Sequence, residues 1–259
     1  MLNALWQVLL LSLIPIGTTA AGAIMAALHP PGPRTRSGVQ HFAAGVVFSV
    51  VAVELLPDVV RGKAVVAVAV GFACGIFVML LLRRINSAIE AGKTEDGDAD
   101  SRNGIPAVVA RAASGRAPVG MLAAVGVDIL LDGILLGSAF AAGAKEGLLL
   151  TIALSIELLS LGLAMTSSLL ARGIGRTAAI SIVIGLSASL AIGAVIGDTV
   201  LHNASVPLMS GVLAFGCATL LFLVTEELLV EAHEVPETLV TTSMFFGGFL
   251  LFLLLGMIG

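Results

Sequence analysis

The stretch VGVDILLDGILLG, residues 125–137, is apolar except for two aspartates four residues apart, Asp128 and Asp132. The surrounding apolar run extends over 118–143, which exceeds the about 20 residues that a helix needs to cross a bilayer. Similar runs occur at 2–28, 39–59, 64–82, 147–171, 177–197, 206–230 and 239–258. The sequence therefore predicts an all-α integral membrane protein with about eight transmembrane helices.

The composition supports a membrane protein. Of the 259 residues, 58% are hydrophobic and 12% are charged, and the mean hydropathy of +1.09 lies far above that of soluble domains. The first run lacks a basic N-terminal region and is long enough to span, so we expect a helix and not a cleaved signal peptide. Cys74 and Cys217 lie in apolar runs without CxxC spacing and are expected to pack.

The distribution of basic residues predicts the orientation. If the loops alternate across eight spans, ten of the 13 Lys and Arg fall on one side, which the positive-inside rule makes cytoplasmic. Both termini are then extracellular or periplasmic, and the protein is a multi-pass protein of the inner or plasma membrane. The segment 84–117 is charged and poor in bulky apolar residues, and is expected to be a poorly ordered cytoplasmic loop.

An internal repeat relates the two ends of the chain. Residues 41–60 can be laid over residues 214–233, which pairs Phe42 with Phe215, Glu54 with Glu227 and Asp58 with Glu231. The repeats are then 1–83 and 172–259, separated by the loop 84–117 and a two-helix unit, 118–171. A shift of five helices reverses the orientation, and such inverted repeats in a 3+2+3 arrangement are typical of secondary transporters. Chance similarity between apolar helices is the alternative.

Three acidic residues are predicted to meet inside the membrane. Asp128 and Asp132 share one helical face because they are four residues apart. Glu157 lies in the middle of the next, antiparallel span and can reach that face. Each acid costs about 2.5–3.5 kcal/mol at a helix centre, and these spans contain no Lys or Arg to pair with it. We therefore expect a cation site, with protonated carboxyls hydrogen-bonded between helices as the alternative.

Further acids lie nearer the predicted membrane surfaces. Glu54 and Asp58 end the second span on the outside, and Glu227, Glu231 and His233 end the seventh span on the inside. They are candidates for a cation pathway or secondary metal sites. The alternative is that long charged side chains extend to water from helix ends. His29, His41 and His202 are expected to be surface residues.

Several of these segments resemble the ZIP family of divalent metal transporters. The stretch FAAGVVFSVVAVELLPD (42–58) is similar to the family's second-helix pattern, and TEELLVEA (225–232) is similar to the seventh. Asp132-Gly133 fits the fourth-helix pattern H-N-x-x-E/D-G, with Asp128 in place of His. In the fifth helix Glu157 takes the position of a His or Gln, and Ser160 that of a Pro.

The resemblance implies transport of zinc, manganese or iron toward the cytoplasm, with the metal as substrate and without a cofactor. It implies one metal site made from Asp128, Asp132 and Glu157, with Ser160 as a further candidate. Because carboxylates replace imidazole, selectivity should shift toward manganese-like ions. Gly133, Gly137, Ala139 and Ala141 are expected to allow close contact between the two-helix unit and the repeats.

Other functions remain open. On the same fold, the acids could serve a proton or monovalent-cation relay or antiporter, or the chain could be a ZIP-like protein without transport. An enzyme is not expected, because the GxGD pattern of intramembrane aspartyl proteases is absent. The expected partners are divalent metal ions and the lipid bilayer, with a homodimer as one alternative for the oligomeric state. A nucleic-acid partner is not expected, because no basic cluster is interleaved with aromatic residues.

Overall fold

A computed structural model describes residues 2–95, 119–233, 235–236, 238 and 239–258. The helical elements are α1 (Leu2–Leu28), α2 (Pro33–Val50), η1 (Val51–Leu55), α3 (Leu56–Arg61), α4 (Val65–Glu95), α6 (Val119–Ala142), α7 (Ala144–Ala171), α8 (Arg176–Leu201), α9 (Val206–Phe222), η3 (Leu223–Leu228), α10 (Leu229–Ala232) and α11 (Leu239–Ile258). No strand occurs in these described ranges. Eight helical segments are long and apolar enough to cross a membrane. The predicted fold class, all-α with eight possible spans, is thus confirmed.

The third long helix continues beyond the end of the predicted membrane span. Helix α4 extends to Glu95, so the prediction of a loop is wrong for residues 84–95. The hydropathy signal stops near residue 82, but Ala, Glu and Lys, which favour helix, follow it. The rest of the predicted loop, together with its acidic run, lies outside the described residues.

Two spans contain a π-helical segment in their second half. One is η1 (Val51–Leu55), which contains Glu54, and the other is η3 (Leu223–Leu228), which contains Glu227. Pro57 follows η1 and cannot donate a hydrogen bond to the carbonyl of Val53, which favours a local change of helical pitch. No proline follows η3 in the same way. Such segments occur frequently at functional sites.

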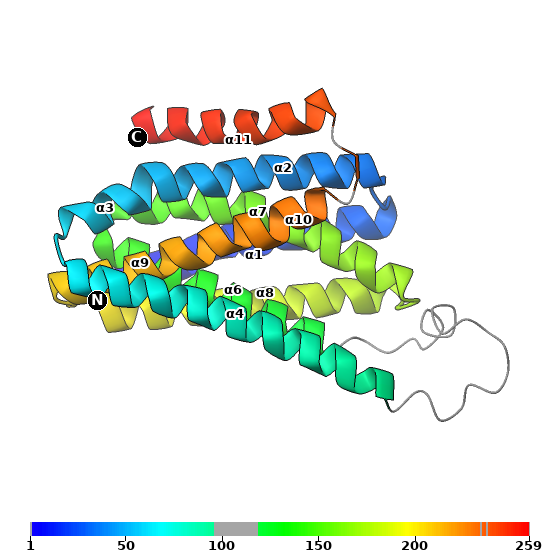
Figure 1. Ribbon diagram of the computed structural model, residues 1–259, viewed down its shortest axis with the longest axis horizontal. Coiled ribbons are helices and arrows are strands. Elements are labelled where there is room, and N and C mark those ends of the chain that lie inside the picture. Colours follow the sequence, from blue (N-terminus) through cyan, green and yellow to red (C-terminus); the bar gives the residue numbers. More distant parts are fainter. Residues whose placement is uncertain (1, 96–118, 234, 237, 259) are drawn as a thin grey trace, which may run out of the picture.

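The helices run side by side along one bundle (Figure 1). The closest pairings are α6 with α8, α1 with α7, α2 with α11, and α4 with α9. Leu2 and Ile258 lie at the same end of the bundle, which we call the terminal end (Figure 1). The opposite end, where α2 begins and α4 reaches Glu95, is called the loop end.

Glycines bring α6 and α8 into close contact, as the sequence predicted for two of the four small residues. A Cβ on Gly133 would lie 2.2 Å from the Leu190 carbonyl oxygen, and a Cβ on Gly137 would lie 2.1 Å from that of Ala194. Of the other two, Ala139 is fully buried. Small residues allow membrane helices to approach so closely that van der Waals contacts hold them together.

Large apolar side chains cover much of the outer surface. Examples are Phe77 of α4 and Phe246 of α11, which are 65% and 64% exposed. Exposed apolar surface of this extent is expected where hydrocarbon replaces water as the solvent. The helices that carry the acidic residues are more enclosed, since Leu136 of α6 and Leu154 and Leu158 of α7 are fully buried.

Candidate functional site

A cavity of about 480 Å³ reaches into the bundle from the loop end. Elements α2, α4, α6, α7, η3 and α10 contribute to its lining. Its polar lining residues are Arg36, Gln40, Arg83, Asp128, Glu157, Ser160, Ser168, Glu226, Glu227 and Glu231. The space is large enough for a cation that keeps part of its hydration shell.

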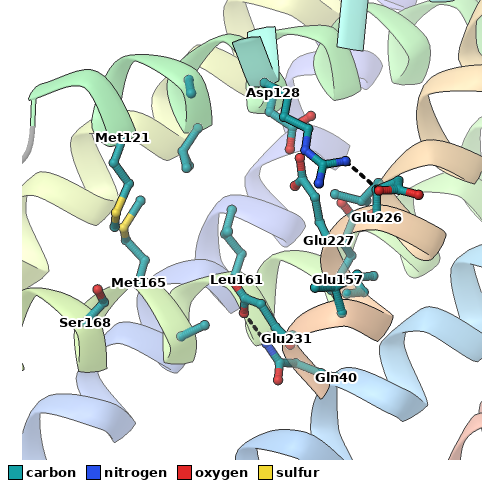
Figure 2. Close-up of a pocket in the computed structure, with 18 of the residues that line it drawn as sticks. Gln40, Met121, Asp128, Glu157, Leu161, Met165, Ser168, Glu226, Glu227 and Glu231 are labelled. Carbon is teal, nitrogen blue, oxygen red and sulfur yellow. Dashed lines mark hydrogen bonds and ion pairs between the residues drawn. The ribbon is translucent and has the colours of Figure 1, made fainter. Parts of the chain in front are cut away.

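Asp128 and Glu157 line this cavity together, from the neighbouring helices α6 and α7. Figure 2 shows them on the same side of the cavity as Glu227. Asp128 interacts electrostatically with Glu157, and Glu227 interacts with both. The predicted meeting of acids from the fourth and fifth spans is therefore present, and η3 adds a further carboxylate.

Asp132 is buried next to these acids but does not line the cavity. It is 5% exposed, and its carboxylate lies close enough to Asp128 and Glu157 for electrostatic interaction. Within the described structure, Asp132 Oδ2 and Glu157 Oε2 are buried acceptors without a hydrogen-bond partner. A buried polar atom left unpaired costs about 1–3 kcal/mol. Two such atoms in one place indicate that a proton, a water or a cation belongs there.

The acids do not form a compact ligand set in this conformation. Among the residues that the structure describes, no three His, Cys, Asp or Glu side chains are arranged to hold a metal ion. Asp128, Asp132 and Glu157 are therefore neighbours with interacting charges and not a formed tridentate site. Such a cluster attracts cations, and water would have to complete the coordination of an ion in the cavity.

One ion pair lies where the cavity meets the loop end. Arg83 Nη1 lies 2.5 Å from Glu226 Oε2, and the two side chains are 58% and 42% exposed. Arg83 also interacts electrostatically with Glu227. From the sequence, Arg83 was predicted only to be one of the ten basic residues on the cytoplasmic side. Its position at the end of an apolar run was a signal, but which acid it meets depends on how α4 packs beside η3.

Gln40 is a second residue that the sequence analysis missed. Its side chain is 1% exposed, and its Nε2 donates a hydrogen bond to Glu231 Oε2 (Figure 2). Its Oε1 is another buried acceptor without a partner among the described residues. The signal for Gln40 in the sequence was a single amide side chain at the start of the apolar run 39–59. Gln40 holds Glu231 at the side of the cavity formed by α2 and α10.

His233 lies beside His41 and is not among the residues that line the cavity. The two ring centroids are 5.2 Å apart. Each Nδ1 donates to a backbone carbonyl oxygen one turn earlier, of Ser37 for His41 and of Leu229 for His233. The expectation of a surface His41 is wrong, since it is 4% exposed. Ser37 Oγ donates to the Ala232 carbonyl oxygen at 2.7 Å, and this contact between α2 and α10 encloses the ring.

The remaining predicted residues divide between the two ends of the bundle. Ser160 lines the cavity one turn after Glu157. Glu54 and Asp58 lie toward the terminal end, outside this cavity. Asp58 Oδ1 pairs with Arg61 Nη1 at 2.6 Å. Glu54 lies against α11, where a Cβ on Gly256 would be 2.9 Å from its Oε1.

The fold and the cavity define a class: helical proteins with the architecture of multi-pass membrane proteins and with acidic side chains deep inside the bundle. No family model matches this sequence, and no curated protein shows significant similarity to it. The function is therefore inferred from the helices and from the residues of the cavity.

Proposed function

We propose that the chain is a ZIP-like secondary transporter that moves divalent cations, zinc, manganese or iron, across the cell membrane toward the cytoplasm. One observation carries the proposal: a cavity from the loop end reaches Asp128 and Glu157, and among the described residues the buried Asp132 Oδ2 and Glu157 Oε2 have no hydrogen-bond partner. Intramembrane carboxylates are costly, and such residues typically mark ion pathways. If the loop end is cytoplasmic, as the Lys and Arg distribution favours, this is an inward-open conformation.

Repeated helix contacts support an inverted repeat. A Cβ on Gly248 would lie 2.2 Å from the Phe42 carbonyl oxygen, and a Cβ on Gly75 would lie 2.7 Å from that of Phe215. The superposition that pairs Phe42 with Phe215 also pairs Gly75 with Gly248. The contacts α2–α11 and α4–α9 are then one contact made twice, in the two halves of the chain.

The two-helix unit supports the same symmetry. A Cβ on Gly133 would meet the Leu190 carbonyl oxygen of α8 at 2.2 Å, and a Cβ on Gly162 would meet that of Thr19 in α1 at 2.4 Å. Asp128 precedes Gly133 by the same five residues by which Glu157 precedes Gly162. The two acids thus occupy equivalent positions on α6 and α7, as expected for a site at the interface of inverted repeats.

The proposed repeat also implies a second opening of the cation pathway, at the terminal end. Glu54 and Asp58 are paired by the superposition with Glu227 and Glu231, and η1 and η3 occupy corresponding stretches. In alternating access, the first pair would line an opening on the outside and the second pair an opening on the inside. The all-oxygen set of carboxylates and water suits hard ions such as manganese.

The direct test is cation uptake into proteoliposomes loaded with a metal-sensitive dye, measured across a panel of zinc, manganese and iron(II). We expect saturable uptake by the wild type and a strong reduction of this uptake in Asp128→Asn and Glu157→Gln. Glu146→Gln is the matched control, because Glu146 lies in the first turn of α7 and not in the cavity. Proton flux without divalent-cation uptake would favour the relay. The absence of both fluxes would favour a protein without transport.

A further inference from the structure

A second groove, of about 310 Å³, lies between α4 and the α9–η3 segment. Its lining is apolar except for Thr225, Arg83 and Glu226. Phe72 and Leu80, which line it, are 37% and 50% exposed. The exposed apolar lining indicates that the groove faces the hydrocarbon of the membrane, where an acyl chain would fill it.

The groove and the central cavity share Arg83 and Glu226. This ion pair therefore forms the boundary between the two spaces; its acidic member, Glu226, is labelled in Figure 2. Both side chains keep a large exposed fraction, 58% and 42%. A molecule in the groove can contact the guanidinium and the carboxylate while they remain paired.

The depth of the ion pair matches that of lipid headgroups. Arg83 belongs to the last turn of the span Val65–Ile85, so it lies near the boundary between hydrocarbon and water. Basic pockets at this depth between transmembrane helices bind the phosphates of anionic lipid headgroups, so Arg83 is a suitable partner for a lipid phosphate. The groove thus has an apolar stretch and a charged end, which match the acyl chain and the headgroup of a phospholipid.

We propose that this groove is a binding site for a phospholipid of the phosphatidylethanolamine type. One acyl chain lies against Phe72 and Leu80, the phosphate accepts hydrogen bonds from Arg83, and the primary ammonium donates to Glu226. The charged lining consists of one cation and one anion, so a zwitterion is its complement.

Other headgroups fit less well. A glycerol headgroup leaves a net negative charge beside Glu226 and Glu227, without an ammonium to offset it. A choline headgroup has the cation but no N–H to donate to the carboxylate. This site does not depend on the proposed transport, because it follows from the groove, the ion pair and the position of Arg83 at the end of the span Val65–Ile85.

The test is lipid retention by the purified full chain in native mass spectrometry. The protein is equilibrated in detergent with equal amounts of phosphatidylethanolamine, phosphatidylcholine and phosphatidylglycerol of identical acyl chains. We expect one retained lipid, predominantly phosphatidylethanolamine. Arg83→Gln and Glu226→Gln should each lower its retention about tenfold, which corresponds to the loss of one charge-assisted hydrogen bond. Arg84→Gln, next in sequence and outside the groove lining, should leave retention unchanged.

A second variant separates recognition from folding. Leu80→Trp fills the groove from an exposed position and should remove the retained lipid without changing elution on size exclusion. Equal retention of the three lipids by the wild type would overturn the proposal. So would preferential retention of phosphatidylglycerol, or full retention of phosphatidylethanolamine by both Arg83→Gln and Leu80→Trp.

Discussion

Gly133 of α6 and Gly193 of α8 face each other so closely that a Cβ on either would lie 3.0 Å from the Cα of the other. This contact packs α6, which carries Asp128 and Asp132, closely against α8. In a bilayer, burial from water does not drive helices together, so such packing and interhelical hydrogen bonds hold them. The position of the acids therefore depends on the absence of side chains at these glycines.

Replacing one of these glycines should destabilise the protein. In Gly193→Ala the new Cβ would lie 2.2 Å from the Leu130 carbonyl oxygen, and we expect a loss of about 1–3 kcal/mol from overpacking. The measurement is the thermal unfolding temperature in detergent. Gly185→Ala is the matched control on the same helix, because among the described residues no atom outside its own helical turns lies within 4 Å of its Cβ position. Equal unfolding temperatures for the two variants would contradict the packing argument.

The cavity predicts which cysteines react from which side. In a Cys74→Ala, Cys217→Ala background, Ser168→Cys should react with an impermeant maleimide added at the loop end, because Ser168 lines the cavity. Ser155→Cys on the same helix should stay unreactive from both sides, since this position is 8% exposed and outside the cavity. Vesicles of known sidedness provide the measurement. Labelling of Ser168→Cys only from the terminal end would oppose the described conformation.

The helices could be predicted because a bilayer imposes a minimum apolar length, which every span satisfies. Asp128 and Glu157 could be predicted as neighbours because a short hairpin makes α6 and α7 antiparallel. The extension of α4 to Glu95 could not be predicted in this way. The run of apolar residues ends near residue 82, whereas residues that favour helix continue beyond it. Gln40 and Arg83 were missed because both lie at ends of spans, where polar residues usually face water. Their direction into the cavity is decided by packing between distant segments.

Glu54 and Asp58 at the terminal end should affect cation capture more than turnover. Glu54→Gln with Asp58→Asn removes two negative charges from the terminal end, which lowers the local concentration of cations. We expect a higher apparent KM for uptake and a smaller change in maximal rate. Concentration dependence of uptake in proteoliposomes measures both. An unchanged KM in the double variant would show that these two residues do not contribute to the cation pathway.

Asp132 should be required for cation binding although it does not line the cavity in this conformation. Its Oδ2 is buried without a hydrogen-bond partner among the described residues, and its carboxyl group interacts electrostatically with those of Asp128 and Glu157. Asp132→Asn keeps the size of the side chain but removes the negative charge. We expect saturable divalent binding to be lost in calorimetry on the purified protein. Ser138→Ala, a polar change on the same helix and outside the cavity lining, should bind as the wild type does. Wild-type affinity in Asp132→Asn would place the site elsewhere.

The residue at position 128 should set the choice between zinc and manganese. A carboxylate offers a hard oxygen ligand, whereas the imidazole of Asp128→His offers a nitrogen, which suits zinc better than manganese. We expect the ratio of the two dissociation constants, measured by calorimetry, to shift toward zinc by about tenfold, or about 1.4 kcal/mol. Zinc is favoured over manganese by the general affinity order at any site, so the change in the ratio is the informative quantity.

Asp128→Asn separates ligand type from charge in this experiment. Its amide oxygen is still a hard ligand, but the negative charge is lost, as it is in Asp128→His with a neutral ring. Asn should therefore weaken zinc and manganese binding together and leave their ratio near that of the wild type, whereas His should change the ratio. If all three proteins showed the same ratio, the side chain at position 128 would not contact the ion, and Glu157 and Glu227 would remain as the candidate ligands in the cavity.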